Sequence, residues 1–232
     1  MTTDGGAHGA LLEALGRRIA AGDPAAGAVL TLAGLESEYR VSRTLVRETI
    51  RVLESLGMVR SRRRIGITVQ PREHWHVLGA ETIRWTLEGP LRHRHLVELM
   101  ELRAALEPVA ARFAAERATA AQRAELVALA TELDRLGRSG LGDGDAYLAV
   151  DIEFHELLLA SSANALYAEL AGPVREILVG RTSLGLTPAV PAAGTLDAHL
   201  SAAHAIAAGD GSAAEHAVRT HIAIVSDEIE QG

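Results

Sequence analysis

The chain has 232 residues, of which 48% are hydrophobic, and it carries no cysteine and a net charge of −7. The lack of cysteine excludes disulfides and thiolate metal sites. No segment approaches the roughly 18 apolar residues of a membrane span, and the N-terminus does not resemble a signal peptide, so we expect a cytoplasmic protein without a membrane partner. Residues 1–72 carry 11 arginines and 7 acidic residues, whereas residues 73–232 carry 12 and 23. This asymmetry predicts a nucleic-acid-binding domain at 1–72 and a second domain at 73–232.

The first 72 residues contain the signals of a winged helix-turn-helix. Thr31 and Ser42 are residue types that cap helix N-termini, and Gly57 is placed to end the third helix. Gly66 lies in a basic run between two β-prone segments, which is typical of a hairpin. The predicted elements are helices over 11–21, 32–39 and 42–56 and β-prone segments at 58–60 and 67–69. A basic helix followed by a basic hairpin predicts a DNA-binding domain of this class.

The third predicted helix has one apolar side and one basic side. Arg43, Thr44 and Arg47 lie on the basic side, and an arginine in the major groove can donate two hydrogen bonds to guanine. An ordinary solvated arginine face is the alternative interpretation. The basic hairpin, whose tip contains Arg64 and Gly66, favours contact with DNA instead. Because one helix reads few base pairs, we expect a homodimer on a palindromic double-stranded operator.

Residues 73–232 show helical periodicity and no strand-like alternation, which predicts an all-α bundle of about six to seven helices. We expect Pro108 to bend or split the second of these helices, and Pro173 lies in the path of the fifth. The fold class is therefore mainly α, with a small β-hairpin in the N-terminal domain. The predicted helices cover about 77–87, 95–117, 119–137, 145–161, 164–183, 195–208 and 212–229.

Four polar side chains lie on the apolar stripes of these helices. They are Asp151 and His155 on one helix, His199 on the next to last and His221 on the last. Because polar groups are costly to bury without partners, the four groups predict either a divalent metal site or a hydrogen-bonded core network. The remaining histidines of the last two helices, His204 and His216, are predicted to face solvent.

The segment from Glu38 to Glu48 resembles the DNA-binding domain of GntR-type bacterial regulators. In that family a Val-Ser-Arg-Thr-x-Val-Arg-Glu run opens the recognition helix, and this chain departs from many members at Leu45, where they have proline. The resemblance implies that Arg43, Thr44 and Arg47 contact DNA. It also implies that Gly66 is the glycine of the wing, with Arg64 beside it.

The Asp-Ile-Glu-Phe-His run that ends at His155 is similar to the ligand domain of the GntR subgroup named after the fatty-acid regulator. Many of its members hold a metal ion with an Asp-x-x-x-His pair and two later histidines. The resemblance implies that Asp151, His155, His199 and His221 bind one divalent ion, with zinc expected and nickel or manganese as alternatives. Ala198 stands where members commonly carry glutamate, which removes a polar neighbour of the site and not a ligand.

Arg103 lies on the apolar stripe of its predicted helix, and a buried arginine needs an anion. Glu107, four residues further along, is one candidate partner. The carboxylate of an effector that also touches the metal is the other, as the resemblance to members that bind sugar acids or hydroxy acids implies.

We therefore expect a transcriptional repressor, not an enzyme, whose DNA binding is controlled by a small organic acid. A metal-dependent hydrolase that carries a DNA-binding module is an alternative, but we find no spare inward carboxylate to act as its general base. A structural metal in a repressor without an effector is a further alternative.

Overall fold

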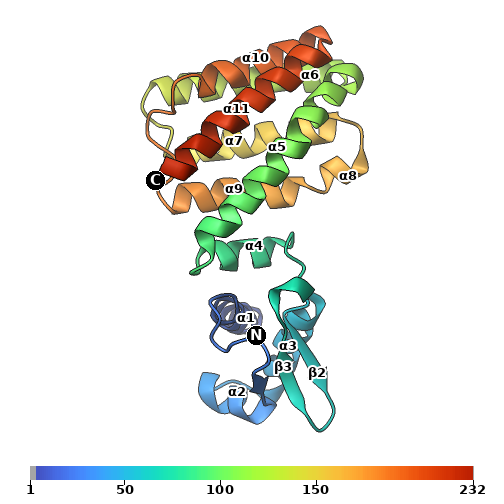
Figure 1. Ribbon diagram of the computed structural model, residues 1–232, viewed down its shortest axis with the longest axis vertical. Coiled ribbons are helices and arrows are strands. Elements are labelled where there is room, and N and C mark those ends of the chain that lie inside the picture. Colours follow the sequence, from blue (N-terminus) through green and yellow to red (C-terminus); the bar gives the residue numbers. More distant parts are fainter. Residues whose placement is uncertain (1–3, 232) are drawn as a thin grey trace. The chain divides into compact units, whose positions relative to one another are not determined.

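The structure is a computed structural model that describes residues 4–231, with side chains described for residues 9–229 (Figure 1). The chain divides into two compact units, Met1–His93 and Arg94–Gly232. Among the described residues, no helix is long and apolar enough to cross a membrane.

The first unit combines helices with a small antiparallel sheet whose strand order is β1-β3-β2. The N-caps predicted from the sequence are confirmed, because the Thr31 side chain accepts from Gly34 N and the Ser42 side chain accepts from Leu45 N. The hairpin is also confirmed, and strand β1 is an addition that pairs with β3. The elements are α1 (Asp4–Ala20), β1 (Val29–Leu30), α2 (Leu32–Tyr39), α3 (Arg43–Ser55), β2 (Val59–Arg62), β3 (Gly66–Val69), the 3-10 turn η1 (Arg72–His74) and α4 (Ala80–Leu87).

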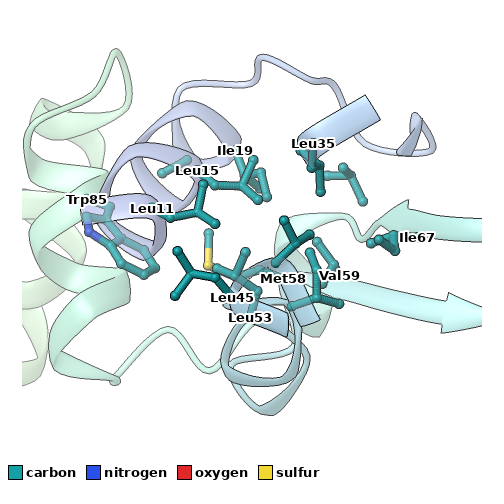
Figure 2. Close-up of a cluster of buried hydrophobic side chains, with 14 residues drawn as sticks. Leu11, Leu15, Ile19, Leu35, Leu45, Leu53, Met58, Val59, Ile67 and Trp85 are labelled. Carbon is teal, nitrogen blue, oxygen red and sulfur yellow. The ribbon is translucent and has the colours of Figure 1, made fainter. Parts of the chain in front are cut away.

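The core of this unit lies between α1, α3 and the sheet (Figure 2). Trp85 of α4 joins the cluster, is fully buried, and donates from its indole nitrogen to Glu13 over 2.8 Å. Gly16 of α1 makes room for the indole, since a Cβ there would lie 2.5 Å from the ring. Helix α4 therefore packs within the first unit, although it follows residue 72, where the charge pattern placed the boundary between the two domains.

The second unit is all-helical among its described residues, as the periodicity predicted. Helix α7 contacts α6 and α9, and α10 contacts α6 and α11. Thr119 and Gln122 form the predicted capping box at the start of α6. The helices of this unit are α5 (Arg92–Arg117), α6 (Ala120–Arg138), α7 (Asp145–Ser161), α8 (Ala165–Ala168), α9 (Ala171–Ser183), α10 (Thr195–Ala208) and α11 (Gly211–Gln231).

The two prolines behave differently from one another. Pro108 does not split its helix, because α5 continues through it from Arg92 to Arg117. The single helix predicted over 164–183 is wrong: it is divided into α8 and α9. Pro173 lies in the first turn of α9, where the missing N–H has no intrahelical acceptor to lose. The proline is thus tolerated because a new helix begins just before it.

Candidate functional site

Helix α3 presents the basic side that the sequence predicted. Its inner residues, among them Val46 and Ile50, are buried, while Arg43, Thr44 and Arg47 are exposed. An open groove runs along this side and is lined by basic residues of both α3 and the hairpin. The arginines that line it are Arg43, Arg47, Arg51, Arg62, Arg63 and Arg64. Within residues 9–229, neither Arg47 nor the groove-lining Arg62, Arg63 and Arg64 form an ion pair, so their charges are available to an external polyanion such as DNA.

The tip of the hairpin has unusual backbone geometry. Arg64 has a φ of 68° and its side chain is exposed, while Gly66 has a φ of 113°. A Cβ at Gly66 would lie 2.8 Å from the carbonyl oxygen of Leu30 in β1. The sheet itself therefore requires glycine here, in addition to any close approach to DNA.

Three histidines from three helices of the second unit meet in its interior. His155 of α7, His199 of α10 and His221 of α11 are 1%, 2% and 5% exposed. One ring nitrogen from each lies within 4.8 Å of the other two. The carboxylate oxygen Oδ1 of Asp151 is 3.5 Å from His155 Nε2 and 3.4 Å from His199 Nε2. The structure thus brings together all four residues that the sequence singled out.

The polar atoms of this cluster have unmet bonding capacity. Asp151 Oδ1, His199 Nε2 and His221 Nδ1 are buried and have no hydrogen-bond partner among the described residues. A buried polar atom without a hydrogen-bond partner destabilises the folded state. Several such atoms close together are typical of a site that binds an ion or a ligand. One carboxylate and three imidazoles are a donor set that divalent transition metals accept. The residues present therefore fit a metal ion.

The protonation states of His221 and Asp151 suit metal binding. Burial, followed by the nearby His199 and His155, holds the pKa of His221 well below its usual range, so its imidazole stays neutral. Burial acts to raise the pKa of Asp151, but the nearby imidazoles of His155 and His199 outweigh it and hold that pKa well below the ordinary value. His199 Nδ1 lies 3.1 Å from the Thr195 carbonyl oxygen, which makes Nδ1 the protonated nitrogen and leaves the Nε2 lone pair toward Asp151.

Arg103 of α5 borders this cluster and is 2% exposed. Its Nε and Nη2 donate to Glu107, the Nη2 bond measuring 3.2 Å, and Nη2 lies 3.3 Å from His155 Nε2. The internal pair that the sequence offered as an alternative is therefore present. Nη1, however, is buried without a partner among the described residues, so its N–H donors are left for another acceptor.

Sequence reasoning missed a second buried arginine, Arg181 of α9, which is 5% exposed. Its Nη2 donates to Glu228 over 3.2 Å, and its Nε has no partner among the described residues. Burial, and then the positive charge of Arg103, lower the pKa of Arg181. The two guanidinium groups therefore repel each other electrostatically. Arg181 follows buried Ile177 by four positions, a spacing that would have placed it on the apolar stripe.

Comparisons with known proteins match most of the chain. Residues 9–69 match the bacterial regulatory proteins of the gntR family, and residues 98–223 match the FCD domain. The galactonate operon transcriptional repressor of Escherichia coli strain K12 is 32% identical over 213 residues, covering 90% of each chain. The HTH-type transcriptional regulator LutR of Bacillus subtilis strain 168 is 28% identical, covering 83% of this chain and 87% of LutR. The solved structure of E. coli McbR/YncC, at 19% identity, covers 100% of this chain and 99% of its own with a TM-score of 0.54, which supports the fold.

Proposed function

Since the chain belongs to the GntR family of bacterial regulatory proteins and carries an FCD domain, it is a DNA-binding transcriptional regulator, and we propose that it is a dimeric repressor released from its operator by a small organic acid. In this proposal residues 1–72 bind DNA and residues 73–232 bind the effector and form the dimer. The hydrolase alternative is not favoured, because the relatives named above are transcriptional regulators.

The exposed basic groove of the first unit supports the DNA-binding role. Arg43, Thr44 and Arg47 of α3 would read base edges in the major groove, and Arg64 and Gly66 would bring the hairpin against the backbone or minor groove. Two such helices in a dimer would read a near-palindromic site.

The unmet bonding capacity around the three histidines supports the sensing role. Asp151, His155, His199 and His221 would hold one divalent ion, with zinc expected and nickel or manganese as alternatives. When bound, the ion supplies a positive centre to which a carboxylate can coordinate. Four protein donors leave room for further ligands in an octahedral shell.

The observation that carries the effector proposal is the free Nη1 of Arg103 next to this cluster. A carboxylate that bridges the metal and Nη1 would satisfy both groups at once. The relative that represses a galactonate operon is named for a sugar acid, so sugar acids and hydroxy acids are the first compounds to test.

The test is titration of the operator complex with candidate acids in the presence of metal. The parent should release DNA with a coupling of about 1–3 kcal/mol between acid and operator. Arg103→Ala should bind the operator as the parent does and lose the response. Arg175→Ala is the control, because Arg175 is exposed on α9 and pairs with Glu156. An unchanged midpoint in Arg103→Ala would mean that Arg103 serves only as the structural partner of Glu107.

A further inference from the structure

We propose that Glu107 is a positioning residue which orients both the metal-binding imidazole of His155 and the effector-binding guanidinium of Arg103. Glu107 lies on α5, is 1% exposed, and belongs to neither group of candidate ligands. The proposal rests on the metal site put forward above.

The contact between Glu107 and His155 sets the tautomer of the imidazole. Glu107 Oε2 is 2.8 Å from His155 Nδ1, and both side chains are 1% exposed. An ionised carboxylate only accepts hydrogen bonds, so Nδ1 carries the proton and Nε2 keeps its lone pair. Nε2 is the nitrogen that faces Asp151, at 3.5 Å. Glu107 thus holds the ring with its ligating nitrogen turned toward the other donors.

The same carboxylate holds Arg103 from one side. Arg103 Nε donates to Glu107 Oε1 and Nη2 donates to Oε2, which forms a two-point contact of the kind that fixes a planar guanidinium. Oε2 is therefore shared between Arg103 Nη2 and His155 Nδ1. With two of its nitrogens engaged, the guanidinium presents the third, Nη1, without a partner among the described residues.

The contact with His155 distinguishes a positioning role of Glu107 from a role that only neutralises the charge of Arg103. A counter-ion for Arg103 alone has no need of a short contact with a histidine on another helix. With that contact, a shift of Glu107 would turn the imidazole and the guanidinium together. Metal affinity should therefore respond to Glu107 although Glu107 does not touch the ion.

The experiment measures zinc affinity by competition with a chelator in Glu107→Gln and in Glu101→Gln, an exposed change on the same helix. We expect zinc binding to weaken about 10–100-fold in Glu107→Gln and to be unchanged in Glu101→Gln. A Glu107→Gln protein that melts like the metal-free parent and binds zinc with parental affinity overturns the proposal.

A second measurement needs no variant. In the zinc-loaded parent, nitrogen-15 NMR of the imidazoles should find the proton of His155 on Nδ1 and the metal on Nε2. A proton on Nε2 overturns the proposal even if Glu107→Gln fails to fold. His199→Ala distinguishes failure of the proposed metal site from failure of the proposed role of Glu107. If His199→Ala keeps parental zinc affinity, the proposed metal site is wrong. If His199→Ala loses zinc while Glu107→Gln retains it, only the role of Glu107 is wrong.

Discussion

Replacing His199 with alanine should abolish the stabilisation that metal gives to the helical unit. The His199 imidazole is 2% exposed, its Nε2 has no partner among the described residues, and that nitrogen lies 3.4 Å from Asp151 Oδ1. The variant keeps Asp151, His155 and His221 and so loses one of four donors. Because a buried imidazole also contributes packing, the quantity to compare is the shift in Tm caused by zinc, not the Tm of the metal-free protein.

The size of that shift follows from mass action. Zinc at 100 times its Kd stabilises the folded state by about 2.7 kcal/mol. A unit the size of Arg94–Gly232 responds with a Tm shift of about 3 °C per kcal/mol, so the parent should gain about 8 °C. If the variant binds zinc about a thousandfold more weakly, the same zinc concentration adds less than about 0.1 kcal/mol, which is too little to detect.

The assay is a thermal melt with and without zinc, together with elemental analysis of the dialysed proteins. His216→Ala is the matched control, because His216 is an exposed histidine on α11, the helix that carries His221. His216→Ala should keep both the bound metal and the shift. Equal metal content and equal shifts in the two variants would refute the assignment of His199 as a ligand.

Three further predictions concern DNA, protons and the N-terminal unit. Arg47→Ala should weaken specific operator binding by about 1–3 kcal/mol at constant salt, measured by fluorescence anisotropy; parental affinity would exclude α3 as the reading helix. Zinc affinity should fall as the pH falls from 7 to 5, because protons compete with zinc for His155, whose pKa burial acts to lower but the charge of Glu107 raises overall. Equal affinities at pH 7 and pH 5 would contradict imidazole ligation. In the first unit, burial acts to raise the pKa of Glu13, but hydrogen bonds from Trp85 and Arg84 lower it overall. The Glu13 carboxylate therefore stabilises the folded state at pH values above its unfolded pKa of 4.5, and this stabilisation is lost as the pH falls through the lowered folded pKa. The contribution is less than about 1 kcal/mol, because the Glu13 and Arg84 side chains are about a third exposed. In Glu13→Gln, the free energy of unfolding measured with urea should therefore fall less steeply at acid pH than in the parent. The same decrease at acid pH in both proteins would contradict this role of Glu13.

The helix caps and the buried and exposed faces of the helices could be predicted from the spacing of residues that are close in the sequence. The N-caps Thr31 and Ser42, the capping box at Thr119 and the two faces of α3 depend on residues within one or two helical turns. The same spacing rule placed Asp151 beside His155 and separated buried His199 from the exposed histidines. Periodicity could say that each polar group faces inward, but not that stripes on three helices meet at one point.

Long-range packing supplied what pattern could not. Strand β1 has two residues, too few for a periodic signal, and exists because Val29 and Leu30 pair with β3. Arg103 reaches His155 across 52 positions, and Arg181 reaches Glu228 across 47. These contacts determine which nitrogen of each guanidinium has no partner among the described residues, and therefore which donors a ligand could bind. They arise because helices distant in the chain bury their apolar stripes against one another, and that packing holds a few charged groups together in the interior of the helical unit.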